Sequence, residues 1–342
     1  MDARQTALQT WVMQRLNDKN LGEPSGSLQT VSGDASFRRY FRQAVATSTG
    51  SYIAVDAPPE KENSQPFIDI AQAWFAQGVR VPQVIAYDLE QGFMLLEDFA
   101  DDLLQPTLEQ DESQATELYH SAFRSLIAIQ QTQYTLPAYD APLLDREMAL
   151  FTEWYLPKHL GYSLSPQERT MLEDTFHMLR ETALGQIQVP VHRDYHSRNI
   201  MCLSSGELGI IDFQDAVLGP LTYDLVSLLR DAYIDWPAEQ VEQWAQDYFA
   251  MAREAGLVGS ISDSQLMLWF DWMGLQRHLK VVGIFARLAY RDGKKRYLDD
   301  IPRTLNYIVQ VSAEYDALTE FHQWLTRHLL PWIEDNTAGD HA

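Results

Sequence analysis

The sequence predicts an α+β protein of two lobes, a small β-rich N-terminal lobe and a larger helical C-terminal lobe. Three observations support this prediction. The chain has 342 residues, which exceeds the usual size of a single hydrophobic core. Residues 25–98 contain several β-forming runs around one helical segment, and the segments after Leu103 have mainly helical periodicity. We therefore place the lobes at residues 1–98 and 99–342.

The N-terminal lobe is expected to begin with an amphipathic helix over residues 1–18 and to continue as a small sheet. The stretches "LQTVSGDASFRRYFRQAV" and "SYIAVDAP" have the composition of β-strands, with "SGDAS" (32–36) as a turn. Apolar residues within 65–79 recur at helical spacing. The stretch "PQVIAYDLEQGFMLLEDF" divides near Gly92 into two strands joined by a tight turn.

Helices predominate in the C-terminal lobe. The stretch "EDFADDLLQPT" (97–107) has the composition of a linker, and a β-rich island at 189–213 interrupts the helical pattern. Periodicity predicts helices at 113–133, 145–160, 166–184, 221–233, 237–256, 263–291 and 302–331.

The composition excludes several classes of partner. A formal net charge of −22 and a pI near 4.7 argue against nucleic acid or an anionic membrane as a partner. The single Cys202 excludes an internal disulfide and fits a reducing compartment. The N-terminus lacks a signal-peptide pattern, and no apolar run reaches the ~18 residues that span a bilayer. We expect a cytoplasmic protein, and these features do not predict its oligomeric state.

Two short strands within the β-rich island bring distant residues together. The runs "IMCL" (200–203) and "LGII" (208–211), joined by "SSGE", predict an antiparallel hairpin. Asn199 and Asp212 then lie side by side at its open end, with Asp194 on the loop that enters it. An amide oxygen and a carboxylate suit Mg²⁺, which prefers oxygen ligands and retains waters.

The same three residues suit phosphoryl transfer. This reaction needs metal ions on the phosphates and one residue that orients the attacking hydroxyl and accepts its proton. We assign the second task to Asp194 as catalytic base, and the first to Asn199 and Asp212 as metal ligands. The pattern "HRD-x4-N" followed by "DF" is the catalytic-loop and metal-loop pair of kinases. The alternative is that these residues only cap a loop and a turn.

Other residues of the loop have supporting roles in this interpretation. His192 is expected to hold the loop through hydrogen bonds to backbone carbonyls, and Arg193 to pair with a carboxylate. Arg198 either supports the loop or stabilises charge on the transferring phosphoryl group. The chain enters a helix within about a dozen residues of Asp212, too few for a regulatory activation loop. The acceptor is therefore expected to be a small molecule.

The motifs "HRDYHSRN", "IIDFQDA" and "GPLTYDL" resemble those of the aminoglycoside phosphotransferase and choline kinase superfamily. The resemblance spans roughly residues 25–330 and implies a two-lobe protein-kinase-like fold that uses ATP and Mg²⁺. It also implies that Asp224 is the buried carboxylate that braces the catalytic loop.

Within the superfamily, "GDASFRRYFR", "VDAPPEKE", "LLEDF" and "LQRHLKVVGIFARL" resemble bacterial kinases of cell-wall recycling. This resemblance implies phosphorylation of the anomeric hydroxyl of N-acetylmuramate and N-acetylglucosamine. Two alternatives remain open. One is a phosphotransferase for another small acceptor, such as an aminoglycoside, choline or homoserine. The other is a nucleotide-binding pseudokinase.

The nucleotide lobe departs from the family pattern. "SYIAVDAPP" has Asp56 near the position where many relatives have Lys, so another cation must neutralise the nucleotide phosphates. Arg38, Arg39, Arg42 and Lys61 are the candidates. The phosphate loop contains only Gly33, so backbone amides and Ser36 are expected to bind the phosphates. The adenine is expected to meet residues 96–99, including Glu97 and Phe99.

A cationic helix is unusual in so acidic a chain. Residues 277–296 contain seven Lys or Arg and one acid, and the spacing places Arg277 and Lys280 on one face. One interpretation is a solvated stripe paired with surface acids. The other is that Arg277 and His278 line the sugar pocket, where Arg277 would bind the lactyl carboxylate of N-acetylmuramate. Asp215 and Trp154 are further candidates for sugar binding, as are Tyr155 and Asp271.

Overall fold

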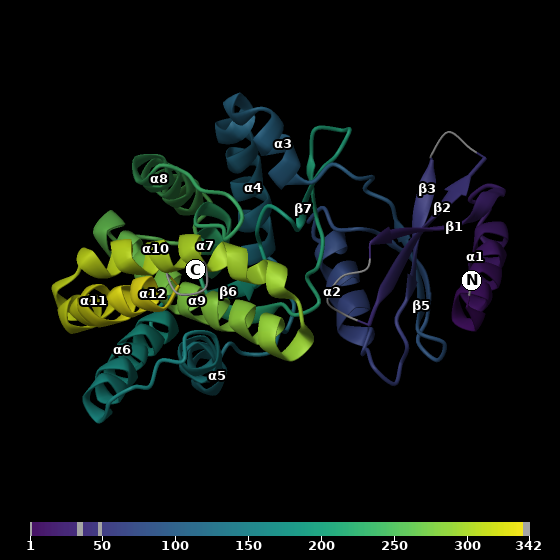
Figure 1. Cartoon of the computed structure of the whole chain (residues 1–342). Helices are drawn as coiled ribbons and strands as arrows, with labels where there is room; N and C mark the ends of the chain where they lie inside the picture. The colour runs from purple at the N-terminus through teal and green to yellow at the C-terminus, as the bar shows by residue number, and fades with distance from the viewer. Residues whose placement is uncertain (1, 33–36, 47–49, 338–342) are drawn as a thin grey trace. The chain divides into compact units, whose positions relative to one another are not determined.

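The computed structural model describes residues 2–32, 37–46 and 50–337. These form two compact units (Figure 1). Unit 1 comprises Met1–Gln110, Thr132–Tyr134 and Arg198–Asp215, and unit 2 comprises Asp111–Gln131, Thr135–Ser197 and Ala216–Ala342. The predicted α+β class is confirmed. Because the hairpin after Ser197 packs with unit 1, the units are not continuous in sequence, and the lobe boundary at residues 98 and 99 stays a prediction.

Unit 1 is built on a five-stranded antiparallel sheet in the order β1-β2-β3-β5-β4. Helix α1 packs against it, and Leu8, Trp11 and Leu16 share a buried cluster with Phe41 of β2 and Leu95 of β5 (Figure 1). The strands are β1 (Pro24–Ser32), β2 (Arg39–Val45), β3 (Ser51–Asp56), β4 (Val84–Asp88) and β5 (Phe93–Glu97). The helices are α1 (Ala3–Asp18), α2 (Gln65–Ala76) and α3 (Leu104–Gln110).

The predicted hairpin is confirmed in unit 1 as β7 (Ile200–Cys202) and β8 (Leu208–Ile210), with Ile200 opposite Ile210. It packs closely on the segment that precedes α3. A Cβ atom on Gly209 would lie 2.5 Å from the ring of Phe99, so only glycine fits there. The prediction of a plain linker over 97–107 was wrong in its second half. Residues from Leu104 onward are helical because Leu104 and Leu108 are buried.

Unit 2 is mainly helical, and α9 is its longest element. Ser262 caps the start of α9 by accepting from the backbone N–H of Gln265, and Gly293 ends it in the left-handed conformation. Its helices are α4 (Ala115–Gln130), α5 (Ala141–Leu150), α6 (Pro166–Leu184), α7 (Tyr223–Leu229), α8 (Ala238–Glu254), α9 (Asp263–Asp292), α10 (Ile301–Ala313), α11 (Thr319–Trp324) and α12 (Leu330–Thr337), with shorter turns at Glu112–Gln114, Lys295–Asp300 and Asp316–Leu318.

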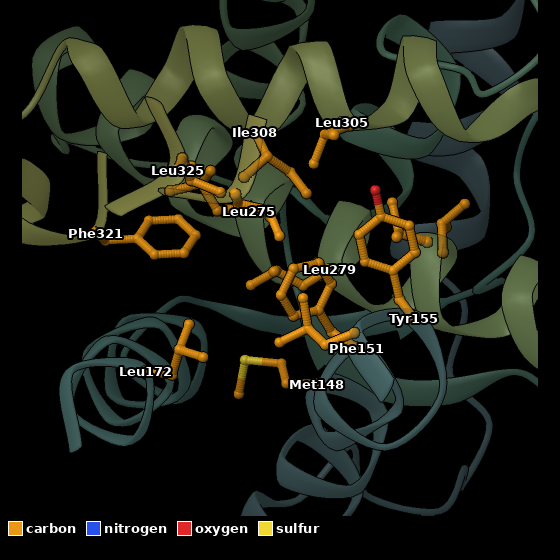
Figure 2. Close-up of a cluster of buried hydrophobic side chains, with 14 of the residues drawn as sticks. Met148, Phe151, Tyr155, Leu172, Leu275, Leu279, Leu305, Ile308, Phe321 and Leu325 are labelled. Carbon is orange, nitrogen blue, oxygen red and sulfur yellow. The ribbon is translucent and has the colours of Figure 1, made fainter. Parts of the chain in front are cut away.

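The core of unit 2 lies along α9. Figure 2 shows Leu275 and Leu279 of α9 among side chains from α5, α6, α10 and α11, including Met148, Leu172, Ile308 and Phe321. Strands β6 (Gln188–Val191) and β9 (Val217–Pro220) pair antiparallel in the same unit and were not predicted as a separate sheet. Within the described residues, none of the helices has both the length and the apolar character that a bilayer span requires.

Three predicted helices differ from those observed. Within the predicted helix 145–160, α5 ends at Leu150 and a π-helix follows over Phe151–His159, which contains Pro157 and so lacks one N–H donor. Helix α7 ends at Leu229, well before residue 233, and Asp231 then accepts from the N–H and the hydroxyl of Ser197 in the loop after β6. The predicted helix 302–331 is interrupted at Tyr315, whose extended backbone lets its hydroxyl donate to Asp271 at 2.5 Å. It resumes as α11, a π-helix over Leu325–Leu329, and α12.

Candidate active site

The loop that contains Asp194 follows β6 in unit 2, and Asp224 of α7 holds its backbone. The carboxylate of Asp224 accepts from the N–H of His192 at 2.6 Å and from the N–H of Arg193 at 3.0 Å. Arg193 has a φ of +76°, which residues with a Cβ rarely adopt. Asp224 is completely buried, and burial raises the pKa of its carboxyl to about 7, although both N–H groups oppose this rise. The predicted bracing contact is therefore present.

Asp194 is partly buried among positively charged and imidazole side chains. Desolvation would raise the pKa of its carboxyl, but Lys280, His196, His192 and Arg277 outweigh this effect and lower the pKa below its ordinary value. Asp194 is therefore ionised at neutral pH and able to accept a proton.

His192 contacts the loop backbone, and its expected hydrogen bonds to backbone carbonyls stay a prediction. Its ring is completely buried, lies against Tyr195 with a centroid separation of 5.8 Å, and accepts from the N–H of Asp194 at 3.3 Å. Tyr195 in turn donates to the backbone oxygen of Ala122 at 2.8 Å. These contacts give the loop a defined conformation before any ligand binds.

A buried ionic cluster lies beside this loop. Oε1 of Glu147 accepts from Nη2 of Arg193 at 2.5 Å and from Nζ of Lys280 at 3.1 Å. Lys280 also donates to the hydroxyl of Tyr223 at 2.8 Å, and the hydroxyl of Tyr139 donates to Oε2 of Glu147. The predicted pairing of Arg193 with a carboxylate is confirmed, and its partner is Glu147.

The open end of the hairpin in unit 1 brings Asn199 and Asp212 together, as the sequence predicts. Nδ2 of Asn199 lies 3.4 Å from Oδ2 of Asp212, and the N–H of Ile211 donates to the backbone oxygen of Asn199 at 3.1 Å. Asp212 has a φ of +66° and accepts from Nε2 of Gln214 at 2.9 Å. Its side chain is exposed, so its carboxylate is accessible to a ligand.

The carboxylate of Asp212 and the amide oxygen of Asn199 fit a hard cation that takes most of its other ligands from water and phosphate. Among the described residues there is no group of three or more His, Cys, Asp or Glu side chains that could hold a metal ion by themselves. One carboxylate and one amide at the hairpin end therefore suit Mg²⁺ brought with a nucleotide better than a permanent structural metal.

Two of the predicted nucleotide residues, Gly33 and Ser36, lie outside the described residues.

Three arginines of unit 1 are near β2, and two of them are neutralised by pairs of carboxylates. Arg39 pairs with Asp56 at 2.5 Å and with Asp2, while Arg42 pairs with Asp98 at 2.5 Å and with Asp101 at 2.8 Å. Asp56 also pairs with Arg4 of α1 at 2.5 Å. Asp56 therefore fastens α1 to the sheet.

Arg38 has a different environment. It is 5% exposed, its Nε lies 3.5 Å from Oε2 of Glu62, and its guanidinium lies 5.8 Å from the ring centroid of Phe67. Phe67 stacks at 4.9 Å on Phe213, the residue after Asp212. Arg38 and Asp212 also both affect the pKa of Tyr40, which burial raises. Arg38 is thus the arginine of this group that lies near the predicted metal residue.

The remaining predicted residues of unit 1 make contacts within it. Glu97 forms a two-point ion pair with Arg80, at 2.5 and 2.7 Å, and the Arg80 guanidinium lies 4.6 Å from the ring centroid of Phe99. Lys61 lies over the exposed ring of Phe37 at 4.5 Å. Arg198 donates to Gln105 at 2.7 Å.

The predicted sugar residues differ in their surroundings. Arg277 is 4% exposed, and within the described residues its Nε and Nη1 atoms have no hydrogen-bond partner. His278 is fully buried, stacks on Tyr307 and contacts the backbone oxygen of Arg230 at 3.1 Å, and burial lowers its pKa to about 3. This is the environment of a core residue, which gives its predicted binding role no support.

Trp154 is partly buried and packs against the core cluster of unit 2, and Asp215 is exposed. Tyr155 is buried in that core, and Asp271 is paired with Arg230 at 2.6 Å. The solvated-stripe interpretation of the cationic helix is wrong for Arg277 and Lys280, since both are buried. It agrees better with Arg291, which is exposed and pairs with Asp292 at 2.8 Å.

The sequence did not reveal the ion pair of Glu147 with Lys280 or that of Glu62 with Arg38. Glu147 is surrounded by apolar residues in an amphipathic helix, and its position toward the core would have been the available signal. Lys280 was noticed only as part of a cationic stripe. Glu62 lies in a segment without periodicity, and its available signal was its place at the end of the motif "VDAPPEKE".

The chain resembles proteins of known function over most of its length. A model described as "Phosphotransferase enzyme family" matches residues 27–257. Proteins named N-acetylmuramate/N-acetylglucosamine kinase from Pseudomonas putida and Pseudomonas aeruginosa are 41% and 40% identical, over 93% and 95% of this chain and 95% and 96% of theirs. A choline kinase from Streptococcus pneumoniae shares the fold at 14% identity and a TM-score of 0.60, over 90% of this chain and 100% of that one. The fold is therefore the kinase-like fold of these enzymes, and the chain belongs to the phosphotransferase enzyme family.

Proposed function

We propose that this protein transfers the γ-phosphoryl group of ATP to the anomeric hydroxyl of N-acetylmuramate and N-acetylglucosamine. The observation that supports this most directly is the identity of about two residues in five with relatives named for these substrates, over nearly the whole chain. The product would be a sugar 1-phosphate, with ADP as the leaving group. A cytoplasmic location agrees with the use of ATP and with the single Cys202.

Asp194 is the proposed catalytic base. Its carboxylate would orient the anomeric hydroxyl and accept its proton as the oxygen attacks the γ-phosphorus and the bond to the β-phosphate breaks. Its lowered pKa keeps it ionised for this task. Asp224 and His192 hold the loop backbone, so the carboxylate is oriented before the sugar arrives.

Asn199 and Asp212 are the proposed ligands of Mg²⁺, which would neutralise charge on the phosphate oxygens. Their contact at the hairpin end supports the assignment. Asn199 follows Asp194 by five residues, the spacing of the kinase catalytic loop.

Arg38 is the proposed cation for the nucleotide phosphates, in place of the absent lysine. In kinases that lysine pairs with a glutamate, and Arg38 pairs with Glu62 at 3.5 Å. Arg39 and Arg42 are each neutralised by two carboxylates, which makes them poorer candidates. Gly33, Ser36, Glu97 and Phe99 remain proposed nucleotide contacts, and Arg198 remains a proposed support of the loop.

Arg277 is the proposed anion-binding residue of the sugar site. A buried guanidinium is stable only when it is paired, and two of its nitrogens have no hydrogen-bond partner within the described residues. The lactyl carboxylate of N-acetylmuramate would fit this position. The positive charges of Arg277 and Lys280 around Asp194 also disfavour cationic acceptors such as choline or an aminoglycoside. Asp215, Trp154 and His278 stay predictions.

The direct test is ADP release with Mg-ATP and a panel of acceptors: N-acetylmuramate, N-acetylglucosamine, glucosamine, choline and kanamycin. We expect release with the two N-acetyl sugars. Release only with another acceptor would keep the kinase reaction and refute the sugar. ATP binding without release on any acceptor would support a pseudokinase.

Replacement of Arg277 by Met should separate the two sugars. Loss of a charged hydrogen bond corresponds to about 10- to 100-fold in binding, and we expect the KM for N-acetylmuramate to rise by this factor. The KM for N-acetylglucosamine, which lacks the carboxylate, should change much less. Arg291→Met, an exposed position on the same helix, is the control. Equal losses of kcat on both sugars would instead indicate that Arg277 stabilises charge on the transferring phosphoryl group.

A further inference from the structure

The residue before the proposed base is held in an unusual conformation from two sides. Arg193 has a φ of +76°, a region that side chains with a Cβ rarely occupy unless the surrounding structure imposes it. Asp224 accepts its backbone N–H at 3.0 Å, and Glu147 binds its guanidinium at 2.5 Å. The first contact restrains the main chain, and the second restrains the side chain.

Glu147 is itself fixed by partners from other elements. Lys280 of α9 donates to it at 3.1 Å, Gln276 of the same helix lies at 3.5 Å, and the hydroxyl of Tyr139 donates to its other oxygen. Lys280 is held in turn by the hydroxyl of Tyr223 at 2.8 Å. The carboxylate thus has donors on both oxygens and little freedom to move.

These groups remain charged although they are buried. Glu147 and Lys280 are 5% and 7% exposed. Burial would raise the pKa of Glu147, but Lys280 and Arg193 outweigh it and lower that pKa. Burial would lower the pKa of Lys280, but Glu147 outweighs it and raises that pKa. The cluster is therefore a set of paired ions.

Stability alone is a poor explanation for such a cluster. The desolvation of buried ions offsets most of their attraction, and apolar residues of similar size often serve the fold as well. What the ions provide is a fixed arrangement of side chains, because each buried charge needs a partner of opposite sign within hydrogen-bond distance. Lys280 also follows Arg277 by three residues, so α9 presents both cations on the same side.

We propose that Glu147, held by Lys280, is a positioning residue that keeps Arg193 in its left-handed conformation and thereby orients the carboxylate of Asp194. This inference rests on the proposed function, because it assumes that Asp194 is the base. Glu147 does not act on the substrate in this account. Its effect on the reaction passes through Arg193.

The test is steady-state kinetics with both N-acetyl sugars for Glu147→Gln, Arg193→Met and the double variant. A small displacement of a catalytic group lowers the rate by up to about 100-fold, so we expect kcat of Glu147→Gln to fall about 10- to 100-fold on both sugars. The KM values should change little. The double variant should be no slower than Arg193→Met, since both changes remove the same restraint. Asp145→Asn, on the exposed side of α5, is the control and should retain wild-type kcat.

Lys280→Arg and Lys280→Met give a second comparison that does not depend on whether Glu147→Gln folds. The arginine retains the charge and should recover most of the kcat that the methionine loses, with folding of each variant checked by thermal melting. Wild-type kcat in Glu147→Gln, or losses that multiply in the double variant, would overturn the inference while the sugar kinase assignment stands. A wild-type protein without ADP release on any acceptor would overturn both.

Discussion

Replacement of Asp194 by Asn is expected to lower kcat at least about 100-fold, the usual scale for loss of a general base. The amide has nearly the same shape as the carboxylate but cannot accept the proton of the attacking hydroxyl. The loop should keep its conformation, because Asp224 and His192 accept hydrogen bonds from its backbone N–H groups and Asn has nearly the shape of Asp. ADP release under saturating Mg-ATP and N-acetylglucosamine measures the effect.

The pH dependence sharpens this expectation. The pKa of Asp194 is lowered, so its carboxylate is already ionised throughout the neutral range. Asp194 should therefore not titrate between pH 6 and pH 8, and the ratio of wild-type kcat to variant kcat should be the same at both pH values. Asp174→Asn, an exposed carboxylate on α6, should behave as wild type. Near-normal turnover of Asp194→Asn would show that another residue is the base.

Replacement of Gly283 by Ala is expected to destabilise the protein more than the other Gly→Ala substitutions in the described part of unit 2. Gly283 lies where α9 crosses the end of α5, and an added Cβ would lie 2.4 Å from the carbonyl carbon of Leu150 and 2.6 Å from the nitrogen of Phe151. These are backbone atoms, so the two helices must separate. Overpacking of this kind costs about 1–3 kcal/mol, and we expect the upper end in denaturant unfolding.

Gly274→Ala is the matched control on the same helix. The nearest atom to its added Cβ is Nη1 of Arg230 at 3.1 Å, the end of a flexible side chain. Alanine is favoured over glycine in a helix by about 1 kcal/mol, so this variant should be close to wild type or more stable. Equal effects of the two substitutions would show that the close helix crossing at Gly283 does not limit packing.

Local patterns accounted for much of the fold. Residues 166–184 form α6 as predicted, because apolar spacing and the Ser165–Glu168 capping box agree on the same start. The break at Tyr315 had no such local signal. Its hydroxyl binds Asp271, a residue 44 positions earlier, and periodicity within a window cannot register a partner so distant. Helix α3 was missed because its burial depends on contacts outside its own sequence.

The sequence by itself determined the reaction class and the adjacency of Asn199 and Asp212, since a motif and a two-strand hairpin are both local. It also identified Asp224 through its resemblance to a family. Only the tertiary structure decided which arginine lies near Asp212, and which partners surround Arg193. Arg38, Arg39 and Arg42 lie within one short stretch of sequence, and their carboxylate partners come from the residue before α1, from β3 and from the segments after β3 and β5. Glu147 and Lys280 are 133 positions apart, and only the packing of α5 on α9 brings their charges together.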